Sequence, residues 1–211
     1  TDSIAINSQA EPALSQDIVY WNAGKHLETM LDYINNKGAK DISFISSSNI
    51  KANHPESFAV EAEAKIAEFR KYVSSHTGIS GELLSPPSPD VIIHIDYESR
   101  NTYEFLKDID LSRFDAIVAH NDAVAQGAAW ALQKQNIQVG KDIMLVGEGD
   151  YLSCRYAIPS ITTISYDKKF MAEEVCRIFK KKLQENRPCA ERILIPSMLI
   201  ERESTKFSVS H

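Results

Sequence analysis

Two histidines and two aspartates recur at the same spacing. His94 precedes Asp96 by two residues, and His120 precedes Asp122 in the same way. Imidazole nitrogens and carboxylates bind divalent metals, so a metal-dependent enzyme is one hypothesis for these four side chains. The competing interpretation is that the histidines pack near a sheet edge and the aspartates cap helices. Metal analysis of the purified protein distinguishes the two.

Other catalytic patterns have little support. The sequence contains neither the GxSxG elbow of hydrolases nor the GxxxxGKS/T phosphate loop. Gly147-Glu148-Gly149 is a GxG without a third glycine, which is more typical of a tight strand exit than of a dinucleotide site. Cys154 has no histidine near it in the sequence that could activate a thiolate. We therefore predict a protein that is not an enzyme, with no catalytic residue, no cofactor and no bound metal.

Composition and charge narrow the class of protein. The 211 residues are 43% hydrophobic and 25% charged, which is typical of a soluble globular protein with one large domain or two lobes. The net charge of −6 argues against nucleic acid as a direct partner. Three cysteines without CxxC spacing fit a reducing, cytoplasmic compartment. No apolar run reaches the about 20 residues of a membrane span, and no signal peptide opens the sequence.

Hydrophobic periodicity predicts alternating strands and helices. Helices are predicted at 23–36, from about 55 to 74, at 99–107, from 122 onward and at 168–183. Strands are predicted at 3–7, 42–45, 91–95, 116–119, 143–146, 162–165, 193–195 and 198–200. Short apolar strands that alternate with helices indicate an α/β fold with mainly parallel sheets.

Polar residues directly after the strands are the first binding candidates, because ligands of parallel sheets bind at the carboxyl ends of strands. These residues are 46–49, 96–97, 120–122 and 147–150. Amide, carboxylate and aromatic side chains in such places suit a polyol such as a sugar, whose hydroxyls need paired donors and acceptors.

Four segments resemble motifs of the lactose-repressor/galactose-repressor (LacI/GalR) family of transcriptional regulators. Residues 119–127 (AHNDAVAQG) resemble AxNDxxAxG, and residues 140–147 (GKDIMLVG) resemble PxDISVVG with Gly140 in place of the usual proline. Residues 159–164 (PSITTI) resemble PPLTTI, and residues 199–205 (LIEREST) resemble the closing LIxREST. The spacing matches without gaps from Phe114 to Thr163.

This resemblance implies an α/β core of two lobes, shaped like a periplasmic sugar-binding protein, with three chain crossings near 46–49, 162–166 and 187–191. Residues 1–46 and 163–187 would form the N-terminal lobe, 47–162 and 188–205 the C-terminal lobe, and 206–211 a tail. The family's core is longer, and we find at most one strand and no helix before Ala23. We therefore expect an N-terminally truncated chain with an incomplete first lobe.

The resemblance also implies a function. The chain would be the effector-sensing domain of a regulator that binds a sugar or sugar-like molecule between its lobes. It would control operator DNA only through a helix-turn-helix absent from this chain. The alternative is a free-standing solute-binding protein of a sugar transporter, which shares the fold. A homodimer without membrane contact is expected, with the helices at 25–36 and 55–74 as candidate contacts.

Five residues carry over as predicted effector-binding residues: Lys65, Tyr97, Asn121, Asp122 and Asp150. Lys65 stands where the family has the arginine of RLxGF, and Gly149 replaces the first aspartate of GFDD. We therefore expect poor binding of neutral hexoses. Lys65, unopposed by that carboxylate, is expected to accept an anionic group such as a sugar phosphate.

Overall fold

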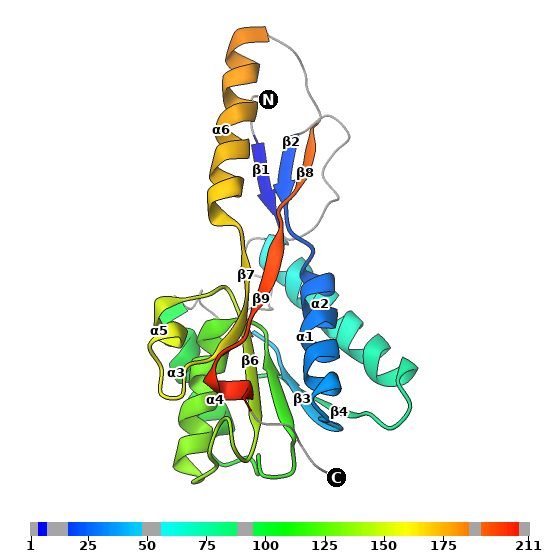
Figure 1. Cartoon of the computed structure of the whole chain (residues 1–211), viewed down its shortest axis with the longest axis vertical. Helices are drawn as coiled ribbons and strands as arrows, with labels where there is room; N and C mark the ends of the chain where they lie inside the picture. The colour runs from blue at the N-terminus through cyan, green and yellow to red at the C-terminus, as the bar shows by residue number, and fades with distance from the viewer. Residues whose placement is uncertain (1–3, 8–16, 48–55, 88–94, 186–190, 207–211) are drawn as a thin grey trace.

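The protein consists of two sheets arranged end to end, as Figure 1 shows for the computed structural model. The structure describes residues 4–7, 17–47, 56–87, 95–185 and 191–206. The small sheet has the order β1-β2-β8 and is parallel throughout. Its strands are β1 (Ile4–Asn7), β2 (Asp17–Tyr20) and β8 (Arg192–Leu194), with α6 (Lys168–Glu185) alongside.

The large sheet has the order β4-β3-β5-β6-β7-β9 and is parallel except for the β7–β9 pair. Its strands are β3 (Asp41–Ile45), β4 (Ser80–Leu84), β5 (Ala116–Ala119), β6 (Met144–Glu148), β7 (Thr162–Tyr166) and β9 (Ser197–Ile200). Its helices are α1 (Ala23–Asn36), α2 (Glu56–Ser75), α3 (Ile95–Leu106), α4 (Asp122–Lys134) and the short α5 (Leu152–Arg155). A 3-10 turn covers Glu203–Thr205. The prediction of an α/β fold with mainly parallel sheets is confirmed.

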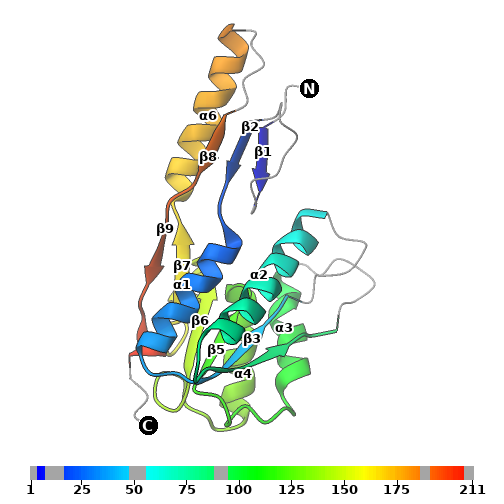
Figure 2. The ribbon, with the colours of Figure 1, turned by 90° about the vertical axis from the view of Figure 1, so that its right-hand side faces the viewer.

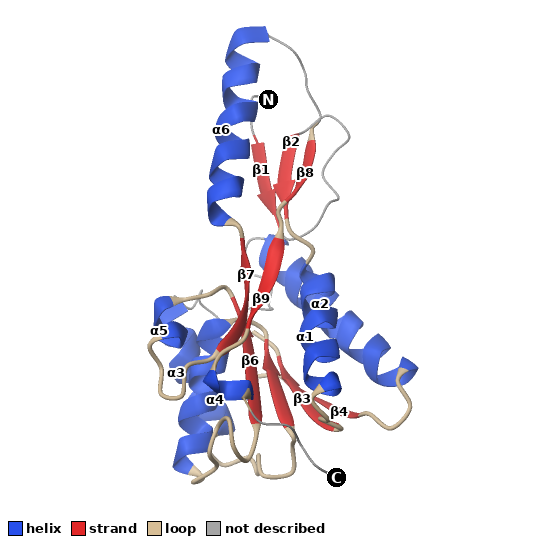
Figure 3. Ribbon diagram, viewed as in Figure 1, coloured by secondary structure: helices blue, strands red, loops and turns tan. Residues whose placement is uncertain are grey.

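Helices cover both faces of the large sheet (Figures 1 and 3). Along β5, Val118 packs with α1 and α2, whereas its neighbours Ile117 and Ala119 pack with α3 and α4. Strands buried on both faces need apolar residues at successive positions, which explains why β5 and β6 are continuous apolar runs. The helix predicted at 23–36 is confirmed as α1, which buries Leu27 and Leu31 against the sheet.

A smaller core joins α6 to the small sheet. Val19 of β2, Ile178 of α6 and Ile195 are buried together. Phe179 and Leu183 of the same helix are exposed. None of the helices in the described ranges is both long enough and apolar enough to cross a membrane.

Three connections pass between the two sheets. They are the segment from β2 to α1, Asp167 between β7 and α6, and residues 195–196 between β8 and β9. In the views of Figures 1 and 2, the parallel strands of each sheet point their carboxyl ends at the other sheet. We call this region, between the two sets of strand ends, the junction.

The division into lobes differs from the expected one at all three crossings, because β3 and β7 lie in the large sheet and β8 lies in the small sheet. The sequence prediction grouped residues 1–46 with 163–187, but β3 pairs with β4 and β5 in the large sheet. The first crossing therefore follows Tyr20 rather than lying near Ser46. The reason is that the apolar stripe of α1 packs against Phe44 and Val118, which belong to the large sheet.

Several elements escaped the sequence prediction. Two strands, β1 and β2, precede Ala23, whereas at most one was expected. The strand β4 and the helix α5 were not predicted either. The strand predicted at 91–95 lies outside the described residues, except that Ile95 begins α3. This helix starts before the predicted Ser99, so Tyr97 lies in its first turn.

The contact between α3 and α4 generates a stability prediction. A Cβ atom on Gly127 of α4 would lie 2.3 Å from the Ser99 carbonyl oxygen and 2.7 Å from the Thr102 Cβ. Gly127→Ala should therefore lower the free energy of unfolding by about 1–3 kcal/mol in urea melts, because the helices must separate. The control is Gly24→Ala in α1, where the nearest atom to the new Cβ is 3.6 Å away. It should be neutral or stabilise by up to about 1 kcal/mol, and similar losses in both variants would contradict the prediction.

Candidate functional site

The predicted binding residues gather at the strand ends that face the junction. Asn121 and Asp122 follow β5, and Asp150 follows β6. Lys65 reaches the ends of the same two strands from α2. Tyr97 lies beside them, because its neighbour Glu98 is hydrogen-bonded to Asn121. The structure therefore brings the five residues to one side of the large sheet, although their partners there differ from residue to residue.

Lys65 is buried in a cluster of charged groups. Only 1% of the residue is exposed, and its Nζ lies 2.9 Å from Glu61 Oε1 and 2.9 Å from Glu148 Oε2. The same Nζ donates to the His120 carbonyl oxygen at 2.9 Å. On the far side of Glu148, its Oε1 accepts from His26 Nδ1 at 2.9 Å. The cluster thus joins α1, α2 and the ends of β5 and β6.

The pKa values of these groups follow from their burial and pairing. Burial opposes ionisation of Glu148, but Lys65 and the hydrogen bond from His26 outweigh it and lower the Glu148 pKa to about 2. The carboxylates of Glu148 and Glu61 overcome the burial of Lys65 and raise its pKa above the ordinary value. Burial and the nearby Lys65 lower the pKa of His120 to about 4. At neutral pH the cluster therefore holds one ammonium, two carboxylates and a neutral His120.

The expectation that Lys65 is an unopposed cation is wrong. Two carboxylates already neutralise its ammonium, so it offers no free charge to a phosphate group. The sequence analysis included Glu148 in the strand-end segment 147–150 but did not identify it as a partner of Lys65. The signal that could have identified it was a charged side chain at the end of an otherwise apolar strand.

Asn121 has two structural roles in the structure. Its Oδ1 accepts from the Val124 backbone N–H at 2.9 Å and so caps α4. Its Nδ2 donates to Glu98 Oε2 at 2.9 Å, and Glu98 Oε1 accepts from the Ser47 hydroxyl. Glu98 therefore ties the end of β3 to the start of α4. One amide hydrogen of Asn121 remains for a ligand.

Asp122 is fully buried and bonded within the protein. Its Oδ1 accepts from the Thr163 hydroxyl and its Oδ2 from the Tyr151 backbone N–H, both at 2.7 Å. Burial raises its pKa to about 6, although both donors act in the opposite direction. A Cβ on Gly147 would lie 2.3 Å from Asp122 Oδ1, so a glycine is required there. These contacts favour a role for Asp122 in holding β7 and the α5 loop.

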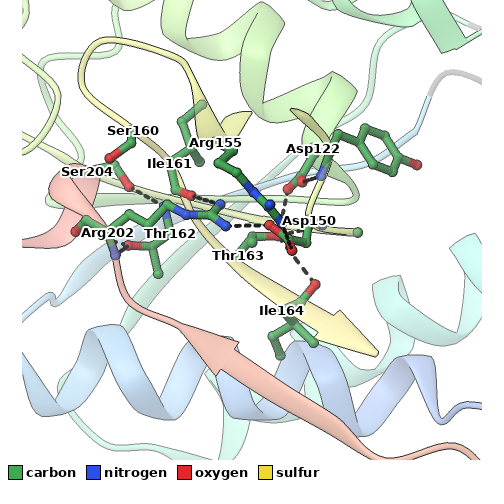
Figure 4. Close-up of polar contacts among 12 residues, drawn as sticks. Asp122, Asp150, Arg155, Ser160, Ile161, Thr162, Thr163, Ile164, Arg202 and Ser204 are labelled. Atoms are coloured by element: carbon green, nitrogen blue, oxygen red, sulfur yellow. Dashed lines mark hydrogen bonds and ion pairs between the residues drawn. The ribbon is translucent and has the colours of Figure 1, made fainter. Parts of the chain in front are cut away.

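Asp150 is held by two arginines (Figure 4). Its Oδ2 lies 2.7 Å from Arg155, and its Oδ1 forms an ion pair with Arg202 of the closing LIEREST segment. Arg202 also donates to the Ile161 carbonyl oxygen at 2.9 Å. Burial acts against ionisation, but the two guanidinium groups lower the Asp150 pKa below its ordinary value. The Asp150 carboxylate is thus committed to anchoring the end of the chain.

Aromatic side chains supply flat surfaces at the junction. The Tyr97 side chain is 63% exposed. Trp21 and Tyr166, from two of the three connections, stack with ring centroids 5.1 Å apart and planes 6° from parallel. Lys168 Nζ lies 5.5 Å from the centroid of the Tyr166 ring and donates to the Gly149 carbonyl oxygen at 2.9 Å. The sequence analysis named Tyr97 but missed this stacked pair.

The metal hypothesis finds no geometric support in the described residues. His94 lies outside them, and nothing is described of the Asp96 side chain. His120 Nε2 is 3.9 Å from Glu61 Oε1, while Asp122 bonds to Thr163 and Tyr151 instead. In the parts of the chain that the structure describes, no three histidine, cysteine, aspartate or glutamate side chains are grouped for a metal ion.

The buried cluster predicts a large effect for Lys65→Met. Removing the ammonium leaves Glu61 and Glu148 buried without their counter-charge, which should cost about 3–5 kcal/mol in the free energy of unfolding. Lys71→Met on the same helix is the matched control, because Lys71 pairs with Glu68 at the exposed surface and its loss should change stability far less. Chemical denaturation of both variants measures the difference, and equal losses would refute the assignment of Lys65 as a buried counter-ion.

Comparison with known proteins identifies relatives of this fold. Residues 31–205 match the family described as Periplasmic binding protein-like domain. The HTH-type transcriptional regulator RegA of Clostridium saccharobutylicum is 30% identical over 169 residues, which are 80% of this chain and 47% of that protein. The regulator GalR of Escherichia coli is 36% identical over 78 residues, 37% of this chain and 22% of that protein. The chain thus spans less than half the length of these curated relatives.

Solved structures share the fold at lower sequence identity. A periplasmic binding protein/LacI transcriptional regulator from Alkaliphilus metalliredigens, complexed with D-xylulofuranose, has a TM-score of 0.74 and 19% identity. That match covers 96% of this chain and 70% of the other. The dimeric Lac repressor has a TM-score of 0.73 and 18% identity, and the match covers 98% of this chain and 69% of the repressor chain. With a family match over most of its length and the two-sheet architecture in agreement, the chain belongs to the periplasmic binding protein-like domain family.

Proposed function

We propose that this chain is the effector-sensing domain of a LacI/GalR-type transcriptional regulator. The observation that carries the proposal is the set of polar and aromatic side chains at the junction, in a fold shared with such regulators. A ligand that bound these large-sheet residues and also contacted the small sheet would favour one arrangement of the two sheets over others. Operator DNA would be bound by a domain outside this chain.

A free-standing solute-binding protein of a transporter is the rival proposal. Both functions use the same fold, so the geometry alone does not separate them. The curated relatives named above are transcriptional regulators, and this supports the sensing function. The ligand-binding residues we propose are Tyr97 and Asn121, because Lys65, Asp122 and Asp150 are held by protein groups.

A calorimetric screen with pentoses, hexoses, amino sugars and sugar phosphates tests the sensing function. At least one of these compounds should bind, and Asn121→Ser should weaken it by about 0.5–1.5 kcal/mol through loss of the amide donor. Serine retains the ability to cap α4, so the fold is preserved. Asn35→Ser is the control, because Asn35 lies in the last turn of α1 and bonds to Lys40 and Tyr72 away from the junction. Binding of no compound in the screen would contradict the sensing function.

We also propose that the chain pairs as a homodimer, through a different surface from the helices expected at first. The apolar stripe of α1 is buried in its own core, as are Phe69 and Tyr72 of α2, so Val60 is the one large exposed apolar side chain among the described side chains of the two helices. A hollow of about 600 Å³ lies instead between α4 and the loop 157–161. Beside it, Trp130 is 42% exposed and Ile158 is 99% exposed. We call this surface the α4 face.

Trp130→Glu should weaken the dimer at least about tenfold, because an aromatic anchor is replaced by a charge. Sedimentation or light scattering across a concentration series measures the shift. Leu183→Glu is the control, since Leu183 is an exposed apolar residue on α6 and should leave the association unchanged. A wild-type chain that is monomeric at high micromolar concentration, or a dimer insensitive to Trp130→Glu, would rule out the α4 face.

A further inference from the structure

Glu98 is a buried carboxylate that contacts only neutral donors. It is 2% exposed, and its oxygens accept from the Ser47 hydroxyl and the Asn121 amide. Among the residues that the structure describes, no lysine, arginine or histidine forms an ion pair with it. Burying an ionised carboxylate is costly unless a positive charge compensates. A carboxylate accepts about four hydrogen bonds, so Glu98 has capacity left for further donors.

The neighbouring charges do not supply that compensation. Lys65 is already shared by the carboxylates of Glu61 and Glu148. Lys168 lies over Tyr166 and bonds to Gly149, which places it at the β6 and β7 end of the sheet. Glu98 bonds instead to groups at the ends of β3 and β5. Among the described residues, the β3–β5 side of the junction therefore supplies no positive charge to Glu98.

A buried ring nitrogen on this side also lacks a partner. His120 follows β5, is 6% exposed, and its Nδ1 has no hydrogen-bond partner among the described residues. The Nε2 of the same ring is the nitrogen nearest Glu61, at 3.9 Å. With the proton on Nε2, the free Nδ1 of a neutral imidazole is an acceptor. Glu98 and His120 can therefore both accept hydrogen bonds from a ligand.

An aromatic ring completes the arrangement. Tyr97 precedes Glu98 in the first turn of α3, and its side chain is largely exposed. The face of a tyrosine ring attracts cations electrostatically and also covers the C–H surface of a sugar. Tyr97 and Glu98 are thus an exposed aromatic residue and a buried carboxylate at consecutive positions, which suits a ligand with an apolar face and a positively charged group.

We infer that the junction binds a ligand that carries a positively charged nitrogen, such as an amino sugar, with Glu98 and Tyr97 as the residues that determine this specificity. The inference rests on the proposed sensing function and narrows its ligand class. An ammonium supplies three donors and a compensating charge to Glu98. A sugar phosphate would meet Glu98 as a like charge, and a neutral hexose would leave the carboxylate without a counter-ion.

Titration calorimetry near pH 6 with matched ligands tests the inference. D-glucosamine and D-galactosamine are compared with D-glucose, D-galactose, N-acetyl-D-glucosamine and D-glucose 6-phosphate. At least one hexosamine should bind about tenfold or more tightly than its parent hexose and the acetylated form, as expected for a charge-assisted hydrogen bond. Acetylation removes the charge while it keeps the nitrogen, so it separates charge from shape.

Two variants assign the preference to residues. Glu98→Gln should bring the affinities for hexosamine and hexose to within about twofold, whereas Glu104→Gln, an exposed glutamate on the same helix, should leave the preference intact. Tyr97→Leu is the second variant, and the exposure of Tyr97 means that it should fold normally while binding hexosamine several-fold more weakly.

The outcomes separate the two proposals. A neutral hexose or the sugar phosphate binding as tightly as the hexosamines overturns the inference and leaves the sensing function standing. A hexosamine preference unchanged in Glu98→Gln overturns the assignment to Glu98. No binding of any of these sugars also overturns the inference, and only the further failure of every compound in the wider screen contradicts the sensing function itself.

Discussion

The ammonium of Lys65 is removed from water, and the elements around it are arranged to compensate its charge. Glu61 comes from the same helix, Glu148 from the end of β6, and the His120 carbonyl from the end of β5. A buried cation that lost these groups would cost several kcal/mol, so α2 and the two strand ends hold their positions together. His26 extends the same network to α1 through Glu148. The strand ends that face the junction are thus fixed by charge as well as by packing.

Periodicity predicted the long elements well, for a physical reason. The apolar stripes of α1 and α4 repeat at helical spacing because each helix buries one face on the large sheet. The strands β2 and β4 carry too little pattern: β2 has four residues, and β4 contains Gly81 and Glu82. Their pairing with distant strands stabilises them, and a local window of sequence does not contain that information.

The location of the candidate site could be predicted from the sequence, but the partners of its side chains could not. Motif spacing located Asn121, Asp122 and Asp150 at strand ends, where the structure has them. Their partners come from distant segments, such as Thr163 for Asp122 and Arg202 for Asp150, so the motif could not reveal that these carboxylates are occupied. Glu98 was overlooked for the same reason, because its significance depends on Ser47 and Asn121 converging on it.

The helix α4 has one end at the junction and its outer face at the surface proposed for pairing. Its first turn is capped by Asn121, and Trp130 projects from the same rigid rod about 13 Å further along. Because Gly127 lets α3 approach without a gap, α4 has little freedom to bend independently of Tyr97 and Glu98. Ligand binding and dimerisation would then both depend on the position of α4. By thermodynamic linkage, if the ligand changes the dimerisation constant by some factor, dimerisation changes the ligand affinity by the same factor. The apparent ligand affinity would therefore vary with protein concentration.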